Sequence, residues 1–403
     1  MPTSIFWGFP AHGHTNPSLP LVSELVHRGE QVYYYSLEEF QPAIERTGAT
    51  FRTYGTDFPL LHILTGPHDP ARMAYGLART SQWILDRLLG EVDALKPDYM
   101  MFDALCPWGS FAAQVLRLPT VCSQTSMAFT FKMVLRNPSS LFGLLWAQLT
   151  GREYTHQCQT ILDTLSTQYH LKKMRPFDLF AQSGMLTIIY TSKLFQPFAD
   201  SFDPQRYTFV GPALMPRSEA PAFPFEALEK EKPLIYISLG TASNNRPEFF
   251  RACIEALGGG DWQIVMAVGT QVERSALGTI PGNVIVREFV PQLEILPRAS
   301  LFLTHGGMNS INEALSFDVP LVVVPQMADQ FWVAKRVEEL GAGKRLSLQK
   351  IDAALLRRVA EEVLFQPAYA QAAARVGKSL REAGGQQKAT DEIQLFQHAQ
   401  HIA

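Results

Sequence analysis

The sequence predicts an α/β protein with two doubly wound domains, each built on a parallel sheet. Strand-length apolar runs alternate with helical patterns through both halves of the 403 residues, as in successive β-α-β units. Runs such as residues 301–304 and 321–324 are apolar throughout, which is typical of strands buried on both faces of a sheet. Residues 215–233 contain four prolines and mixed charges, which predicts a linker between the two domains.

In the first half, apolar runs bounded by glycine, proline or polar residues predict seven strands. They are residues 5–9, 31–36, 50–54, 99–102, 120–123, 186–191 and 207–211. Apolar positions along one side predict helices at residues 18–27, 40–47, 72–95 and 107–116. Residues 127–175 are rich in Phe, Met, Leu and Trp without this rhythm, and we expect irregular helices there.

In the second half the alternation restarts, with strands expected at residues 234–239, 262–268, 284–286, 301–304 and 321–324. Helices are expected at residues 247–257, 309–317, 353–364, 369–383 and 389–398. We therefore expect an N-terminal domain, a linker, a C-terminal domain and a C-terminal helix at residues 1–214, 215–233, 234–385 and 386–403.

The composition is that of an ordinary globular protein. The net charge is −3 and no cluster of five or more Lys and Arg occurs, so a nucleic-acid surface is not expected. The four cysteines stand apart, without a CxxC pair, like small buried residues in a reducing compartment. The N-terminus does not resemble a signal peptide, and no apolar stretch has the length of a membrane span. We expect a cytoplasmic protein without stable membrane insertion.

Residues 288–330 contain a strand, a glycine turn at His305-Gly306-Gly307, a helix and a second strand. The N-terminus of such a helix presents unpaired N–H groups and a positive dipole end, which suit an anion. A second glycine turn at residues 240–243 follows the first strand of the same half. Together the two turns could neutralise a diphosphate, and the absence of any Asp-x-Asp argues against a bridging metal ion. The dinucleotide-binding GxGxxG and the P-loop are also absent, so hydride transfer and P-loop phosphoryl transfer lose support.

Three further polar side chains are expected near this turn. Glu313 lies one turn into the helix, where its carboxylate would point back toward the glycines and suit the hydroxyls of a ribose. Asp329 and Gln330 follow the next strand at the same sheet edge, where they could hold sugar hydroxyls. Either Glu313 or the Asp329-Gln330 pair alone is explained as well by an ordinary charged surface, whereas the set favours a binding site.

The loop AHGHTNP after the first strand lies where open α/β sheets bind ligands. A histidine side chain titrates near neutrality, so we interpret His14 as a general base for a hydroxyl. The alternatives are a histidine that caps the next helix and a metal pair with His12, for which no third ligand is evident. Asn16 and Ser18 are interpreted as helix caps. Asp103 ends the run YMMFD, where it either orients His14 or caps the helix that follows.

Several motifs occur in order along the chain: FPAHGHTNP, PDYMMFD, YTFVGP, ISLGT, FVPQLEIL, THGGMNSINEAL and VPLVVVPQMADQ. With them the sequence resembles the family 1 glycosyltransferases of the GT-B fold, and most closely the bacterial members that glycosylate macrolides and flavonoids. This resemblance implies two Rossmann-like domains that face each other across a cleft. It also implies an inverting, metal-independent transfer of a sugar from a UDP-sugar, expected to be UDP-glucose, to a hydroxyl of a lipophilic flavonoid, other phenol or macrolide.

The resemblance further implies residue roles. His14 would be the general base and Asp103 its partner. The contacts to the UDP-sugar would be Thr241, Phe289, Val290, Gln292, His305, Gly307, Asn309, Ser310, Glu313, Asp329 and Gln330. Phe289 stands where plant members often carry the tryptophan that stacks on uracil, and a phenyl ring can still stack. Apart from the UDP-sugar as donor, no bound cofactor is expected.

An acceptor pocket is expected in the aromatic and methionine-rich segment, because such side chains repack around different ligands. Its candidates are Met127, Phe129, Phe131, Phe142 and Trp146, although ordinary core packing explains any one of them equally well. Two other functions stay open, an epimerase of the same fold and a non-catalytic nucleotide-sugar or lipophile-binding protein. An epimerase needs no acceptor pocket, and binding alone needs neither His14 nor Asp103. We expect a monomer.

Overall fold

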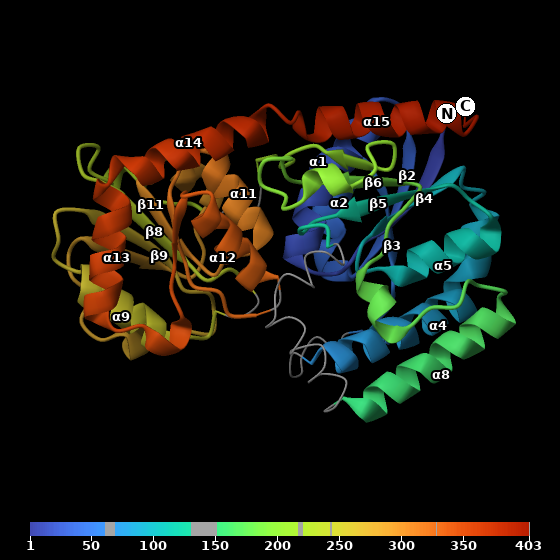
Figure 1. Ribbon diagram of the computed structural model, residues 1–403, viewed down its shortest axis with the longest axis horizontal. Helices are drawn as coiled ribbons and strands as arrows, with labels where there is room; N and C mark the ends of the chain where they lie inside the picture. The colour runs from blue at the N-terminus through green and yellow to red at the C-terminus, as the bar shows by residue number, and fades with distance from the viewer. Residues whose placement is uncertain (61–68, 130–150, 217–220, 242–243, 328, 403) are drawn as a thin grey trace. The chain divides into compact units, whose positions relative to one another are not determined.

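The computed structural model describes the whole chain except residues 61–68, 130–150, 217–220, 242–243, 328 and 403 (Figure 1). The chain folds into two compact units, each a parallel-sheet α/β structure, which confirms the predicted fold class. The first unit comprises Met1–Tyr190, Gln196–Ala213 and Gly384–Ala403, and the second comprises Thr191–Phe195 and Leu214–Ala383. The expected limits of the two domains, the linker and the C-terminal helix remain predictions, because this division into units does not test them.

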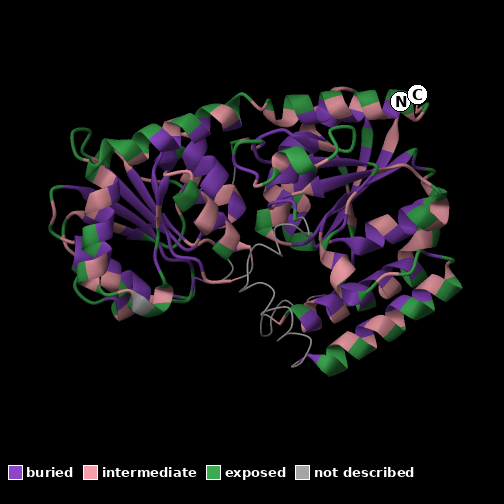
Figure 2. Cartoon of the chain, viewed as in Figure 1, coloured by how far each residue is buried: buried purple, intermediate pink, exposed green. Residues whose placement is uncertain are grey.

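The first unit contains a seven-stranded sheet in the order β3-β2-β1-β4-β5-β6-β7. All of its neighbouring strands pair in parallel. The strands are β1 Thr3–Trp7, β2 Gln31–Ser36, β3 Thr50–Thr53, β4 Tyr99–Asp103, β5 Thr120–Gln124, β6 Leu186–Ile189 and β7 Tyr207–Phe209. The central strand β4 is buried at all five residues, as its apolar sequence predicts (Figure 2).

Helices of the first unit follow the predicted pattern with two differences, in α8 and in α1. They are α1 His12–His27, α2 Gln41–Glu45, α4 Pro70–Ala94, α5 Pro107–Leu116, α8 Arg152–Gln168 and α15 Gly385–Ala399. Helix α8 is a regular helix of 17 residues, so the expectation of irregular helices is wrong for that part of residues 127–175. Helix α15 lies against α1, and Arg28 in the turn that ends α1 donates to Asp391 and Gln394 (Figure 1).

The second difference concerns α1, which begins at His12 and not at residue 18. Pro17 and Pro20 lie inside this helix, although a proline removes an intrahelical hydrogen bond. Both prolines are buried with their apolar neighbours, so packing on the sheet outweighs that loss. The predicted caps are therefore wrong: Ala11 precedes the helix, and the Ser18 hydroxyl donates to the carbonyl of Thr15.

The second unit contains a six-stranded parallel sheet in the order β10-β9-β8-β11-β12-β13. Its strands are β8 Leu234–Ser238, β9 Gln263–Ala267, β10 Val284–Arg287, β11 Leu301–Thr304, β12 Leu321–Val323 and β13 Gly343–Arg345. Its helices are α9 Pro247–Leu257, α10 Gln292–Ile295, α11 Met308–Ser316, α12 Gln330–Glu339, α13 Ala353–Phe365 and α14 Pro367–Arg381. None of the helices in the described parts of the chain has the length and apolar character that crossing a membrane requires.

Candidate active site

His14 and Asp103 meet at the carboxyl end of the first sheet. His14 lies in the first turn of α1, which follows β1, and Asp103 is the last residue of the neighbouring strand β4. Nδ1 of His14 lies 2.9 Å from Oδ2 of Asp103. The side chain of Asp103 is 2% exposed and that of His14 is 23% exposed, so a ligand can still reach the imidazole. The contact brings together the two residues that the sequence proposes as base and partner.

The second oxygen of Asp103 stabilises the turn after β4. Oδ1 accepts a 2.8 Å hydrogen bond from the backbone N–H of Leu105. The residue that precedes α5 is Cys106, so the alternative in which Asp103 caps this helix is wrong. Because one carboxylate oxygen is held by the backbone, the other is presented to His14 in a defined direction.

The environment of His14 determines which of its nitrogens can accept a proton. An ionised carboxylate only accepts hydrogen bonds, so Nδ1 carries the hydrogen that bonds to Asp103. The lone pair of the neutral ring is then on Nε2, which is the atom that can take a proton from a hydroxyl. The ring of Phe9 packs against the imidazole with 4.8 Å between ring centroids. His12 packs instead on the ring of Phe40, at 5.1 Å.

One residue near His14 was not expected from the sequence. The hydroxyl oxygen of Thr125 lies 2.9 Å from the same Nδ1 atom. Thr125 follows directly after β5, the neighbour of β4, and is 4% exposed. Its position at the carboxyl end of a central strand was the signal that could have identified it. No group of three or more His, Cys, Asp or Glu suited to a metal ion occurs in the part of the chain that the structure describes.

The second unit places His305 between β11 and α11, in a slot formed by two glycines. A Cβ atom on Gly240 would lie 2.6 Å from Cε1 of His305, and one on Gly307 would lie 2.5 Å from its Nε2. Both positions therefore need glycine, and Gly240 also has a positive φ of 76°. The loss of hydration in this slot lowers the pKa of His305 to about 4. His305 is thus neutral near pH 7 and can offer a hydrogen bond without a positive charge.

Helix α11 begins beside this imidazole. Gly307 is its N-cap residue and provides no side-chain cap, so the first N–H groups depend on other partners. Asn309 and Ser310 lie in the first turn and are partly exposed. On the adjoining turn, Thr241 is exposed, and Asn244 donates a 2.9 Å hydrogen bond to the carbonyl of Gly240. This arrangement has the donors of an anion site at a helix N-terminus.

Glu313, Gln292 and Tyr236 form a hydrogen-bonded chain in the second unit. The amide of Gln292 donates to the carboxylate of Glu313 at 2.6 Å, and the hydroxyl of Tyr236 donates to Gln292 at 3.1 Å. Glu313 is 4% exposed, so the amide pairs a carboxylate that is almost fully buried.

Phe289 and Val290 lie between β10 and α10, and Phe289 is 49% exposed. An aromatic ring with that exposure is available for stacking on a base.

Asp329 and Gln330 lie at the start of α12. Asp329 is the N-cap residue, and Gln330 is the first residue of the helix. The side-chain oxygen of Gln330 accepts hydrogen bonds from the backbone N–H groups of Gln326 and Met327, at 2.9 and 3.2 Å. The amide oxygen of Gln330 thus stabilises the loop after β12, and its amide nitrogen is the group suited to a ligand hydroxyl.

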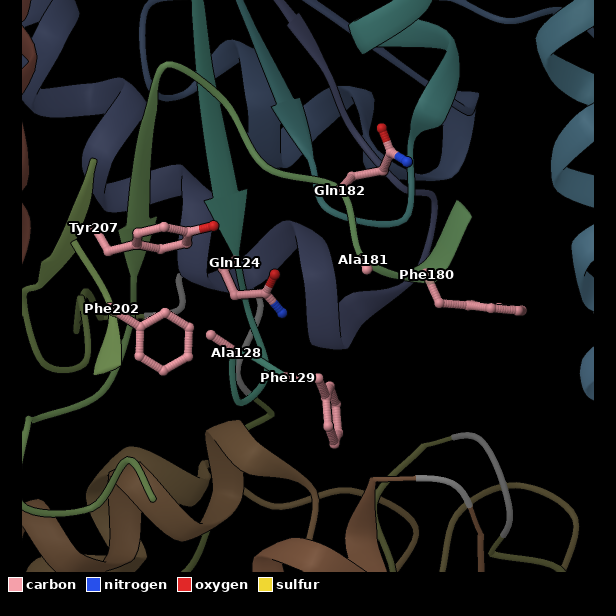
Figure 3. Close-up of a pocket in the computed structure, with 8 residues that line it drawn as sticks. All are labelled: Gln124, Ala128, Phe129, Phe180, Ala181, Gln182, Phe202 and Tyr207. Carbon is pink, nitrogen blue, oxygen red and sulfur yellow. The ribbon is translucent and has the colours of Figure 1, made fainter. Parts of the chain in front are cut away.

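The first unit also contains a pocket beyond the end of β5 (Figure 3). Its lining residues are Gln124, Ala128, Phe129, Phe180, Ala181, Gln182, Phe202 and Tyr207. Gln124 donates to the carbonyl of Met127, and Gln182 donates to the carbonyl of Asp178. Each amide group therefore uses its N–H on the backbone and retains an oxygen that can accept a hydrogen bond. The enclosed volume is about 40 Å³, which is less than a flat aromatic ligand occupies, so these rings and acceptors can contact only one edge of such a ligand.

The expected acceptor residues are only partly located by the structure. Phe129 lines the pocket, with 39% of its surface exposed. Met127 is fully buried and lies outside the pocket lining. The other three candidates, Phe131, Phe142 and Trp146, lie outside the described residues.

Comparison with known proteins places the chain in a family. Residues 251–388 match the family described as "Erythromycin biosynthesis protein CIII-like, C-terminal domain". The chain is 37% identical over 391 residues to "Uncharacterized UDP-glucosyltransferase YojK" of Bacillus subtilis (strain 168), which covers 96% of this chain and 95% of that protein. It is 35% identical over 399 residues to "NDP-glycosyltransferase YjiC" of Bacillus licheniformis, covering 97% and 96%.

A solved structure agrees with these relatives. The calicheamicin glycosyltransferase CalG4 matches the fold with a TM-score of 0.83 at 28% identity, covering 99% of this chain and 98% of that chain. Sequence similarity over nearly the whole chain and the shared two-unit fold thus lead to one conclusion. The protein is an enzyme that belongs to the family 1 glycosyltransferases of the GT-B fold.

Proposed function

We propose that this enzyme transfers a sugar, with inversion, from a UDP-sugar to a hydroxyl of a lipophilic aromatic small molecule. The observation that carries the proposal is the 2.9 Å contact between His14 Nδ1 and the buried carboxylate of Asp103. The similarity to a protein named as a UDP-glucosyltransferase supports UDP-glucose as the donor. The exposed phenyl ring of Phe289 supports stacking on the uracil of this donor.

The proposed reaction is a single displacement. The acceptor oxygen forms a bond to the anomeric carbon, while the bond from that carbon to the diphosphate oxygen breaks with both electrons leaving on UDP. The proton of the acceptor hydroxyl passes to Nε2 of His14, and Asp103 stabilises the imidazolium that forms. General-base catalysis of this kind contributes roughly 10²–10⁴ in rate.

On the donor side, we propose that hydrogen bonds from the protein stabilise the leaving diphosphate. His305 would donate a neutral N–H, and the uncapped start of α11 would add backbone N–H groups and its dipole. Thr241, Asn309 and Ser310 would contribute side-chain donors. With these donors, a metal ion is not required in the proposed mechanism. Glu313 and Gln292 would hold the ribose and the base, and Asp329 and Gln330 the transferred sugar.

For the acceptor, the lining of the pocket beside β5 supports contact with one edge of a hydroxylated aromatic compound, such as a flavonoid, more than with a fully apolar one. Its rings provide apolar contact, while the two glutamine oxygens and the Tyr207 hydroxyl suit phenolic hydroxyls. Macrolides carry hydroxyls as well but present no flat ring for these aromatic side chains.

The proposal is tested by incubating the full-length protein with UDP-glucose labelled in the sugar and a panel of flavonoids, simple phenols and macrolides. Label recovered in a phenolic glycoside is the expected result. A control incubation with UDP-glucose alone should yield only slow hydrolysis. A new sugar nucleotide in that control would instead indicate an epimerase, and absence of both products with tight UDP binding would indicate a binding protein.

A further inference from the structure

Thr125 shares the nitrogen of His14 that Asp103 contacts. Its hydroxyl oxygen lies 2.9 Å from Nδ1, and Oδ2 of Asp103 lies 2.9 Å from the same atom. We propose that Thr125 is a positioning residue for the general base, which acts with Asp103 to fix the imidazole for proton transfer. This inference rests on the proposed function, because it requires His14 to be the base.

The two partners approach His14 from different strands. Asp103 ends β4, where its other oxygen is held by the backbone of Leu105, and Thr125 follows β5. A ring held at one nitrogen by a single partner can still rock about that hydrogen bond. A second partner on a neighbouring strand restricts this rocking, and the packed ring of Phe9 restricts it further. The direction of Nε2 is then determined by three separate parts of the sheet edge.

The hydrogen-bond inventory determines the role of the hydroxyl. Nδ1 carries one hydrogen. The carboxylate of Asp103 can only accept, so Nδ1–H donates to it. The oxygen of Thr125 therefore accepts from the same N–H, in a shared hydrogen bond. When Nε2 takes a proton, the ring becomes cationic, and hydrogen bonds from a charged donor are stronger. Thr125 thus stabilises the protonated ring more than the neutral ring, as a partner in proton transfer should.

Among the described neighbours of the ring, Asp103 can titrate, whereas Thr125 and Phe9 cannot. Replacing Thr125 by valine removes the hydroxyl and keeps the side-chain shape. The protonated ring then loses an acceptor and releases its proton more easily. The acidic limb of the kcat/KM profile should therefore move to lower pH while the rate at the optimum falls. A residue that served only the fold would not move this limb.

The experiment compares Thr125→Val, Thr125→Ser and Thr80→Val in the full-length enzyme, with UDP-glucose and a phenolic acceptor. Thr125→Val should lower kcat roughly three- to tenfold, because the hydroxyl contributes only the difference between its hydrogen bonds to the charged and neutral rings, and KM for UDP-glucose should not change. Thr125→Ser should restore kcat and the pH profile, because it restores the hydroxyl. Thr80 on α4 is a matched control, since its buried hydroxyl has no hydrogen-bond partner among the residues that the structure describes, and Thr80→Val should behave as wild type.

An unchanged kcat and pH profile in Thr125→Val would overturn the inference, as would an acidic limb that moves to higher pH. Failure of serine to restore either quantity would overturn it as well. Thermal unfolding of each variant identifies a folding defect. If Thr125→Val has such a defect, Thr125→Ala is compared with Thr125→Ser in its place. His14→Ala is measured in parallel: full activity in that variant refutes the proposed base itself. An inactive His14→Ala beside a wild-type-like Thr125→Val refutes only the role of Thr125.

Discussion

The side-chain amide of Gln292 donates a 2.6 Å hydrogen bond to the carboxylate of Glu313, a residue 21 positions later on another helix. The first residue of α10 is thereby joined to the second turn of α11. These are the residues expected at the nucleoside and at the ribose of the donor. The amide keeps a nearly buried carboxylate paired.

Glu313→Ala is expected to weaken the binding of UDP roughly 10- to 100-fold, because hydrogen bonds to a carboxylate contribute roughly 1.5–3 kcal/mol. Isothermal titration with UDP measures the effect. Glu294→Ala is the control, since Glu294 is an exposed carboxylate on the short helix α10 and should leave the affinity unchanged. Equal affinities for wild type and Glu313→Ala would exclude a ribose contact.

Replacement of the proposed base should separate chemistry from donor binding. His14→Ala should lower kcat for hydroxyl acceptors by roughly 10²–10⁴ and leave the affinity for UDP within about twofold. His12→Ala, two residues away, is a matched control because its ring packs on Phe40 and lies outside the proposed proton path. Steady-state assays and UDP titration of both variants make the comparison. A His14→Ala enzyme with normal turnover would show that another group takes the proton.

The slot around His305 predicts a strict requirement for glycine at position 240. In Gly240→Ala the new Cβ would meet the imidazole at 2.6 Å in a backbone conformation with φ of 76°. We expect a loss of stability of roughly 1–3 kcal/mol and weaker UDP binding, because the ring must move. Gly282→Ala is the control, since no described residue other than its two chain neighbours lies within 4 Å of its Cβ position. Urea unfolding and UDP titration measure the stability and the UDP affinity of both variants. Equal stability and equal affinity in the two variants would contradict a slot that requires glycine at position 240.

The depressed pKa of His305 predicts a pH-dependent stability. The unfolded chain binds a proton at this residue near pH 6.5, whereas the folded protein binds it only near pH 4. The unfolded state therefore holds more protons between these values, and stability falls as the pH decreases through this window. Between pH 7 and pH 5 the contribution lost should be about 2 kcal/mol. Urea unfolding at pH 7 and at pH 5 measures this loss. From pH 7 to pH 5, His305→Gln should lose less stability than wild type, and an equal loss would contradict the prediction.

The acceptor pocket is tested by removing one hydroxyl. Tyr207→Phe keeps the ring that lines the pocket and should raise KM for a polyhydroxylated flavonoid roughly three- to tenfold, with KM for UDP-glucose unchanged. Tyr154→Phe on α8 is the control, because that tyrosine is exposed and lies outside the lining. A comparison of KM values for flavonoids with and without extra hydroxyls completes the test. An unaltered KM for every flavonoid would exclude a contact with Tyr207.

Local sequence predicted most of the regular structure because the apolar runs of this chain are long and sharply bounded. Strand β11 and helices α5 and α9 begin and end at the expected residues. Helix α12 and strand β13 were not predicted. The strand consists of Gly343–Arg345, a glycine and two basic residues, and it is a strand because it pairs with β12. Its backbone partners come from elsewhere in the chain, so no local pattern identifies it.

For the candidate site, the sequence by itself determined which chemical groups end the central strands: an imidazole after β1, a carboxylate at the end of β4 and a glycine turn after β11. Parallel strands gather their carboxyl ends at one edge, so a residue at a strand end is a predictable neighbour of the next one. Only the tertiary structure decided which oxygen of Asp103 meets His14, and that the same nitrogen also meets Thr125. It likewise decided that His305 loses its hydration between two glycines. Hydrogen bonds and desolvation depend on separations of a few tenths of an ångström, which packing sets and spacing along the chain does not.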